Sequence, residues 1–340
     1  MRIRNELTYS FDDVLLVPQY STIDSRADVD LSTQIGAIKL TLPLLSANMD
    51  TVTEGKMAVA MGRAGGAGVL HRFASTKDLY GWLRACNEYP AIISVGLNVD
   101  IPWLQSNNNL IDALCIDVAH GDHYRVIALL KELRANFPDQ DIIAGNVATG
   151  DAARRLVMAG ANIIKVGIGP GSVCSTRIVS GHGMPQLSAI MEVREWTSEM
   201  NSRTYIIADG GIRYPGDIVK ALAAGADAVM LGSLLAGTDE AAGERIVEHG
   251  VAYKTFRGMA SRDVQTQKRA GQTLRIEGVT AKVPYRGPVS DTLDNLEAGI
   301  RSGLSYSGAN NLAELREVAE FVVVTGNTLK ESHPHHPYRL

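Results

Sequence analysis

Short apolar runs recur along the chain, and amphipathic stretches separate them. The runs cover residues 44–48, 68–71, 92–97, 113–117, 142–146, 163–166, 205–209 and 228–231. Stretches such as 122–135, 150–159 and 216–224 repeat apolar residues at three and four places, the pattern of a helix packed on one face. We expect the runs to be strands, and their alternation with helices predicts parallel pairing.

Eight strand–helix units before residue 250 fit the size of a (β/α)8 barrel. A doubly wound sheet usually carries a glycine fingerprint after its first strand, and no G-x-G-x-x-G follows 44–48. The sequence therefore predicts an α/β protein with a (β/α)8 TIM barrel as a single domain over 1–340. It also predicts an eighth helix over 239–248, a mobile flap at about 258–283 and an irregular C-terminal tail from 331.

Composition narrows the class of protein. The 340 residues are 45% hydrophobic and 21% charged, which excludes a disordered or fibrous chain. A formal net charge of -4 argues against a nucleic-acid surface, because phosphate neutralisation needs clustered Lys and Arg. No run approaches the roughly 18 apolar residues of a membrane span, and the N-terminus lacks a signal core. We expect a cytoplasmic enzyme with no nucleic-acid or membrane partner.

The segment GIGPGSVCSTR, residues 167–177, carries the strongest chemical signal. Its glycines allow backbone amides to close around an anion, and a thiol among exposed N–H groups can act as a thiolate nucleophile. Cys86 and Cys115 lie in apolar surroundings typical of small buried residues. Three cysteines without C-x-x-C spacing indicate neither a disulfide scaffold nor a zinc site. Cys174 is therefore the candidate nucleophile.

Polar residues and glycines follow the predicted strands, where barrel enzymes place their loops. The sequences DGGI at 209–212 and LGS at 231–233 follow strands seven and eight, and together with Ser172 they indicate a phosphate site. Asp117 and Asn146 end strands; each can bind a ligand or the nucleophile loop, or cap the following helix. His120 and His123 have no third metal ligand placed by the sequence, so we interpret them as loop histidines.

Several motifs resemble one enzyme superfamily from end to end. They are FDDVLLVPQYS, SANMDTVTE, CIDVAHG, AGNVAT, KVGIGPGSVCSTR, GMPQLSAI, FRGMAS and VPYRGPV, in family order. On these motifs the chain resembles the inosine monophosphate dehydrogenase and guanosine monophosphate reductase superfamily. The resemblance implies a barrel that forms a homotetramer, binds a purine mononucleotide (GMP or IMP) and uses a nicotinamide cofactor.

The same resemblance implies roles for individual residues. Cys174 would attack purine C2, while Thr176 and Glu277 would handle protons near the leaving group. Substrate-binding positions would be Ser46, Met49, Asn146, Ser172, Asp209, Gly210, Gly211, Gly232, Ser233, Gly258, Met259 and Ser261. Cofactor contacts would come from Asp117, Ala119 and His120. Potassium would be held by carbonyls of Gly169, Gly171 and Cys174.

The flap favours the reductase branch. Dehydrogenases of the superfamily activate water with an Arg-Tyr pair, whereas 259–277 here contains Arg262, Arg269 and Arg275 but no tyrosine. Asn48 and the segment 71–73 also look like reductase forms, and the short segment 73–77 has no room for a CBS regulatory domain. We therefore expect NADPH-dependent reductive deamination of GMP to IMP and ammonia, with purine salvage as its role.

Two other hypotheses stay open. FRGM and the tail SHPH are more like the dehydrogenase branch, so the alternative is an IMP dehydrogenase that lacks the regulatory domain and converts IMP and NAD to XMP. A catalytically silent nucleotide-binding barrel is a third hypothesis, which the presence of Cys174, Thr176 and Glu277 argues against. A Cys174→Ser variant with unchanged activity would favour that third hypothesis.

Overall fold

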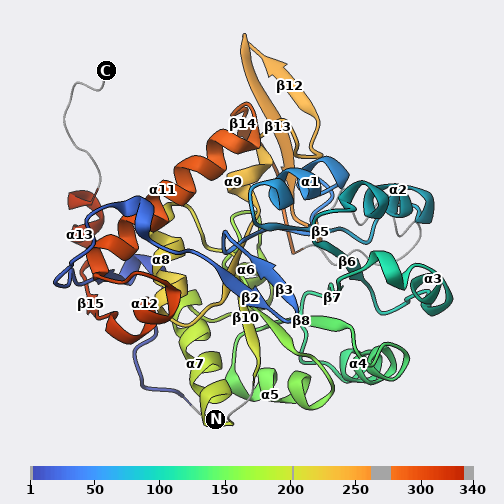
Figure 1. The fold of residues 1–340 in the computed structure, drawn as a ribbon, viewed down its shortest axis with the longest axis horizontal. Coiled ribbons are helices and arrows are strands. Elements are labelled where there is room, and N and C mark those ends of the chain that lie inside the picture. Colours follow the sequence, from blue (N-terminus) through green and yellow to red (C-terminus); the bar gives the residue numbers. More distant parts are fainter. Residues whose placement is uncertain (1–2, 201–202, 262–276, 333–340) are drawn as a thin grey trace.

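A closed barrel of eight parallel strands forms the centre of the protein (Figure 1), and this confirms the predicted fold. The computed structural model describes residues 3–200, 203–261 and 277–332. The barrel strands are β4 (Leu44–Ser46), β5 (Ala67–Leu70), β6 (Ala91–Val95), β7 (Ala113–Ile116), β8 (Asp141–Val147), β9 (Ile163–Val166), β10 (Tyr205–Asp209) and β11 (Ala228–Leu231). Strand β11 pairs with β4 and closes the barrel. Each apolar run of the sequence therefore forms the expected strand.

Helices surround the barrel (Figure 1). They are α1 (Gly55–Arg63), α2 (Thr76–Cys86), α3 (Ile101–Ser106), α4 (Tyr124–Asn136), α5 (Gly150–Met158), α6 (Thr176–Ser180), α7 (Gln186–Glu199), α8 (Pro215–Ala223), α9 (Ser233–Ala236), α11 (Val289–Ser307), α12 (Leu312–Val318) and α13 (Gly326–Glu331). Helix α5 shows why the pattern works: Thr149 caps its N-terminus, while Ala152, Ala153 and Leu156 share the buried face. Within the described residues, no helix combines the length and apolarity of a membrane span.

Side chains of the barrel strands alternate between two cores. In β7, Ala113 and Cys115 belong to the core inside the barrel, whereas Leu114 and Ile116 pack outward against the helices. A hairpin of β2 (Thr33–Ile35) and β3 (Ile38–Leu40) joins the inner core and closes the amino-terminal end of the barrel. The opposite end, where the carboxyl ends of the strands lie, is left for a ligand.

The predicted eighth helix at 239–248 is wrong. Within that range the structure has strand β12 (Arg245–Glu248), which pairs with β13 (Val251–Arg257); β14 (Thr280–Pro284) completes this small antiparallel sheet. His249 and Gly250 both have positive φ and form the tight turn of the hairpin. Cross-strand pairing therefore replaces the helix, and the hairpin projects from the barrel (Figure 1).

The remaining elements lie outside the barrel. Strand β1 (Val14–Leu16) pairs antiparallel with β15 (Phe321–Val323). Short 3-10 helices are η1 (Phe11–Asp13), η2 (Arg26–Asp28) and η3 (Asn108–Leu110). The flap predicted at 258–283 is described only at its two ends, because residues 262–276, including Arg262, Arg269 and Arg275, lie outside the described residues. The predicted tail begins within α13, and residues 333–340 also lie outside them.

Candidate active site

A cavity of about 1110 Å3 opens at the carboxyl ends of the barrel strands. Residues at or just beyond the carboxyl end of each barrel strand contribute to its wall, as expected for a barrel enzyme. Most predicted site residues line it: Cys174, Thr176, Glu277, Met49, Asn146, Ser172, Asp209, Gly210, Gly211, Gly232, Ser233, Gly258, Met259, Asp117, Ala119, Gly169 and Gly171. Residues separated by more than two hundred positions in the sequence therefore meet around one ligand-sized space.

A chain of three side chains connects the nucleophile to a carboxylate. Cys174 is exposed, and its Sγ lies 3.2 Å from Thr176 Oγ1. Thr176 Oγ1 donates in turn to Glu277 Oε2 at 2.9 Å. A carboxylate one hydroxyl away from a thiol can accept or return a proton at the reacting atom. This arrangement, from here on called the proton relay, brings together the three predicted catalytic residues.

The two described ends of the flap, 258–261 and 277–279, are bonded to each other and to the cysteine loop. Glu277 N donates to Ala260 O at 3.0 Å. Ser175 N donates to Glu277 O at 3.1 Å, and Val279 N donates to Val173 O at 3.0 Å. These backbone bonds hold Glu277 beside Cys174 although the two residues lie far apart in the chain.

Backbone at the ends of β9, β10 and β11 has the shape expected of an anion site. Gly210 and Gly211 have φ of +93° and +83°, a conformation that residues with a Cβ rarely adopt. Ser172, Gly232 and Ser233 line the same cavity from the neighbouring loops. Hydroxyl and amide donors in the loops after three adjacent strands suit a phosphate group.

Asn146 and Asp209 form a polar cluster with a residue that the sequence analysis missed. Lys165 on β9 is buried, and its Nζ lies 2.8 Å from Asp209 Oδ2. Asn146 Nδ2 donates to the same oxygen at 2.9 Å. Burial alone would lower the pKa of Lys165, but Asp209, Cys115 and Asp117 raise it to about 12. A lysine in the otherwise apolar run 163–166 was the available signal.

Asp117, directly after β7, pairs with a cation. Arg72 Nε donates to Asp117 Oδ2 at 3.0 Å, and the guanidinium lies over the ring of Phe73. Trp103 also lines the cavity. Neither Asp117 nor Asn146 caps a helix, because His123 and Thr149 accept from the first turns of α4 and α5. The capping alternative is therefore excluded for both residues.

Three predicted site residues are not among the residues that line the cavity. Ser46 is fully buried, with its Oγ accepting from Thr53 Oγ1 at 2.8 Å. Ser261 is buried at the end of the flap, and His120 is exposed on the loop after β7. In this structure the two serines are therefore buried in the protein interior, and His120 is exposed at the surface.

Within the described residues, no group of three His, Cys, Asp or Glu side chains is arranged to hold a metal ion. The predicted potassium ligands are backbone carbonyls. Gly171 O already accepts from Cys174 N at 3.0 Å, and a carbonyl oxygen has a second lone pair left for a cation.

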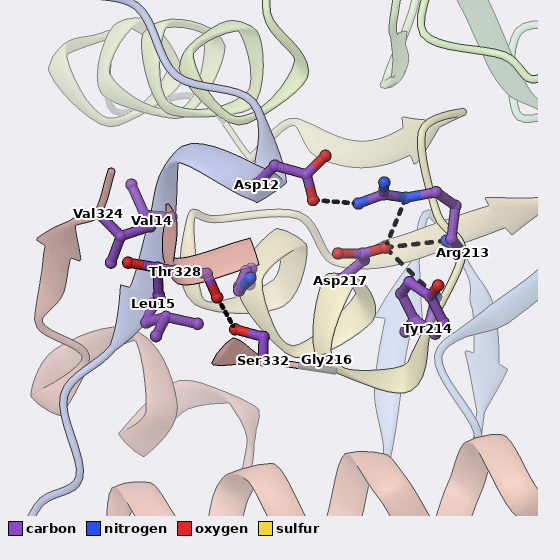
Figure 2. A pocket seen from close by; sticks show the side chains of 11 residues that line it. Asp12, Val14, Leu15, Arg213, Tyr214, Gly216, Asp217, Val324, Thr328 and Ser332 are labelled. Carbon is purple, nitrogen blue, oxygen red and sulfur yellow. Dashed lines mark hydrogen bonds and ion pairs between the residues drawn. The ribbon is translucent and has the colours of Figure 1, made fainter. Parts of the chain in front are cut away.

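A smaller cavity of about 320 Å3 lies next to the large one, and Asp12 and Arg213 line both. Figure 2 shows Arg213 between the carboxylates of Asp12 and Asp217. Apolar side chains such as Val14 make up much of the rest of its wall. Its lining residues include no thiol, so the candidate chemistry belongs to the large cavity.

The fold and site together define the class: a (β/α)8-barrel protein with an exposed cysteine at a polar, glycine-rich cavity. A family model described as "IMP dehydrogenase / GMP reductase domain" matches residues 8–335. The chain therefore belongs to the IMP dehydrogenase/GMP reductase family, whose members are oxidoreductases of purine metabolism that use a nicotinamide cofactor.

Curated relatives match almost the whole chain. One named inosine-5'-monophosphate dehydrogenase from Borreliella burgdorferi is 37% identical over 97% of each chain. Proteins of the same name from Aquifex aeolicus and Methanocaldococcus jannaschii are 35% and 34% identical, covering 98% of this chain and 96% of their own. The first two alignments extend over 396 and 475 positions, more than the 340 residues here, so those relatives carry segments without a counterpart in this chain.

Proposed function

We propose that this protein oxidises or reduces a purine nucleotide at C2 through a covalent bond to Cys174. The proton relay is the observation that carries the proposal, because it places a nucleophile, a hydroxyl and a carboxylate in sequence at the cavity. Ser172, Gly211 and Ser233 would hold the 5'-phosphate, and the Asp209 carboxylate would accept a hydrogen bond from a ribose hydroxyl.

A bound nicotinamide cofactor would supply the hydride-transfer chemistry at C2, as acceptor in the oxidation or as donor in the reduction. The cavity of about 1110 Å3 has both polar and apolar lining residues, and Asp117 and Ala119, the proposed cofactor contacts, are among them. The protein's own part is to form the Sγ–C2 bond, to keep the nucleotide fixed and to move protons through Thr176 and Glu277. In the oxidation, water then attacks C2, its proton passes to Glu277 through Thr176, and the thiolate leaves.

For the direction of the reaction we propose IMP dehydrogenase, which converts IMP, NAD and water to XMP. The names of the relatives support this activity, and they favour it over the reductase that the sequence analysis preferred. The absence of a tyrosine from 259–277 does not exclude it, since the proton relay supplies a carboxylate that can activate water.

GMP reductase is the second candidate, and the flap sequence favours it. Without the Arg-Tyr pair, ammonia rather than hydroxide would be the group exchanged at C2, and Glu277 with Thr176 would protonate the departing amine. NADPH would then supply the hydride.

One steady-state comparison separates the two. Purified protein is given IMP with NAD, and separately GMP with NADPH, while nicotinamide absorbance and nucleotide products are followed. Formation of XMP supports the dehydrogenase, whereas ammonia and IMP from GMP support the reductase. A Cys174→Ala variant should be inactive in both assays. Turnover by that variant, or no turnover of either pair by the wild type, would refute the shared chemistry.

We also propose that the chain is a single catalytic barrel without a CBS regulatory domain. Strand β5 ends at Leu70 and α2 begins at Thr76, which supports this organisation because the connection is too short for an inserted domain. The homotetramer, the cytoplasmic location, and potassium at Gly169, Gly171 and Cys174 stay predictions. Size measurement in solution and activity with potassium replaced by sodium would test the first and the last.

A further inference from the structure

Lys165 is a cation enclosed in the barrel wall. Strand β9 is buried along its whole length, and Lys165 is 4% exposed. Gly145 on β8 leaves room for it, since a Cβ there would lie 2.8 Å from that of Lys165. Taking an ammonium out of water is costly unless it is paired. A lysine kept at this position therefore needs a reason beyond packing.

The partners of Lys165 all come from neighbouring strands. Its Nζ contacts Asp209 Oδ2 on β10 at 2.8 Å and Asn146 Oδ1 on β8. Cys115 and Asp117 of β7 are the other titratable groups whose charge acts on it. These interactions keep the ammonium protonated at any physiological pH, so Asp209 always faces a positive charge.

Both donors in this cluster use the same oxygen of Asp209. Lys165 Nζ and Asn146 Nδ2 bind Oδ2, at 2.8 and 2.9 Å, and Asn146 Nδ2 also donates to Gly167 O at 2.8 Å. Among the described residues no hydrogen bond is made by Oδ1, and the Asp209 side chain is 22% exposed at the cavity. Because hydrogen bonds to Oδ2 fix the orientation of this carboxylate, Oδ1 can accept a hydrogen bond from a ligand hydroxyl in a defined direction.

We propose that Lys165 is a positioning residue that holds Asp209 so that Oδ1 accepts a hydrogen bond from a ribose hydroxyl of the bound nucleotide. The inference rests on the proposed function, because it takes the ligand to be a purine ribonucleotide. Lys165 acts through Asp209 and is not required to touch the ligand. Its loss therefore weakens recognition of the sugar, not of the phosphate or base.

The test compares binding of IMP with binding of 2'-deoxy and 3'-deoxy IMP by calorimetry, without cofactor. A hydrogen bond from a hydroxyl to a carboxylate changes affinity by about 10-fold to 100-fold. The wild type should show that preference for IMP over at least one deoxy analogue. Lys165→Met should lose most of it through weaker binding of IMP, while its affinity for that deoxy analogue changes less than about 3-fold. Lys165→Arg, which keeps the charge, should recover part of the preference.

Lys254→Met is the matched control. Lys254 is also buried, but its ammonium donates to the carbonyls of Thr238 and Asp239, at 2.9 and 3.4 Å. This variant should keep the wild-type preference for IMP. Equal weakening of IMP and the deoxy analogues in Lys165→Met would mean a purely structural role and would overturn the proposal.

A second comparison covers the case in which Lys165→Met does not fold. The double variant Lys165→Met/Asp209→Asn removes both charges, and it is compared with Asp209→Asn alone. If Lys165 acts only through Asp209, the two should bind IMP within about 2-fold of each other. A larger difference contradicts the proposal. A wild type that binds neither IMP nor GMP would instead refute the proposed function.

Discussion

Replacement of Glu277 by glutamine is the sharpest test of the proton relay. The amide oxygen of glutamine can still accept from Thr176 Oγ1, which now bonds Oε2 at 2.9 Å, so the threonine stays in place beside Cys174. The basic carboxylate is lost and little else changes. Because general acid–base catalysis contributes roughly 10²–10⁴-fold, turnover should fall by that factor, equivalent to about 3–5 kcal/mol.

The reaction steps that precede the attack of water should still take place in the Glu277→Gln variant. If Cys174 reacts as the thiolate, formation of the Sγ–C2 bond and hydride transfer need neither water nor a proton acceptor, so their rate constants should stay within about 10-fold of the wild type. With IMP and NAD, stopped-flow absorbance should show a burst of reduced cofactor followed by very slow turnover. Intact-protein mass spectrometry should then show the nucleotide covalently attached.

Thr176→Ser is the control, because serine keeps the hydroxyl between Sγ and the carboxylate. Its turnover should stay within about 10-fold of the wild type. The reasoning is refuted if Glu277→Gln turns over at the wild-type rate. It is equally refuted if the burst slows in proportion to turnover, since Glu277 would then act on the first half of the reaction.

Further predictions concern the thiols and one glycine. Burial raises the pKa of Cys86 to about 11 and that of Cys115 to about 12. Iodoacetamide at pH 8 should therefore modify only the exposed Cys174 in the folded protein. A second modified peptide, found by peptide mass mapping, would contradict this prediction. Because the folded-state pKa of Cys115 is raised, its contribution to the free energy of unfolding is complete below pH 9 and declines as the pH rises toward 12. Cys115→Ala should therefore lose less stability than the wild type above pH 9, measured by urea denaturation. Gly167→Ala should lower the free energy of unfolding by about 2 kcal/mol or more, because the added Cβ would lie 2.1 Å from a backbone carbonyl oxygen of β10. Gly216→Ala is the control: its Cβ would meet open space, so the free energy of unfolding should change by less than about 1 kcal/mol.

The barrel can be predicted from the sequence because each of its strands is a short apolar run. Such runs occur in parallel strands covered on both faces, and the strand at 163–166 has the predicted bounds. The segment 239–248 is predicted as a helix because charged and small residues there also suit a helix. What decides its structure is the His249–Gly250 turn and the pairing with β13, an interaction that a single-segment pattern does not contain.

The candidate site was predictable to the level of loops, not of side-chain partners. Glycines and polar residues mark the strand ends, and this was enough to bring Cys174 and Asp209 to one cavity. Lys165 was missed because it lies within an apolar run, where its partner comes from the next strand of the barrel. Likewise, the pairing of Arg72 with Asp117 joins two loops whose proximity exists only in the closed barrel.

The hydrogen bonds between the cysteine loop and the flap ends have an evolutionary consequence. Glu277 is held in register by Ser175 and Ala260, outside the intervening part of the flap. Sequence change between those anchor points can therefore occur without moving the backbone contacts that place Glu277 beside Cys174. The barrel can in this way tolerate substitutions in that segment while the position of its carboxylate stays constant.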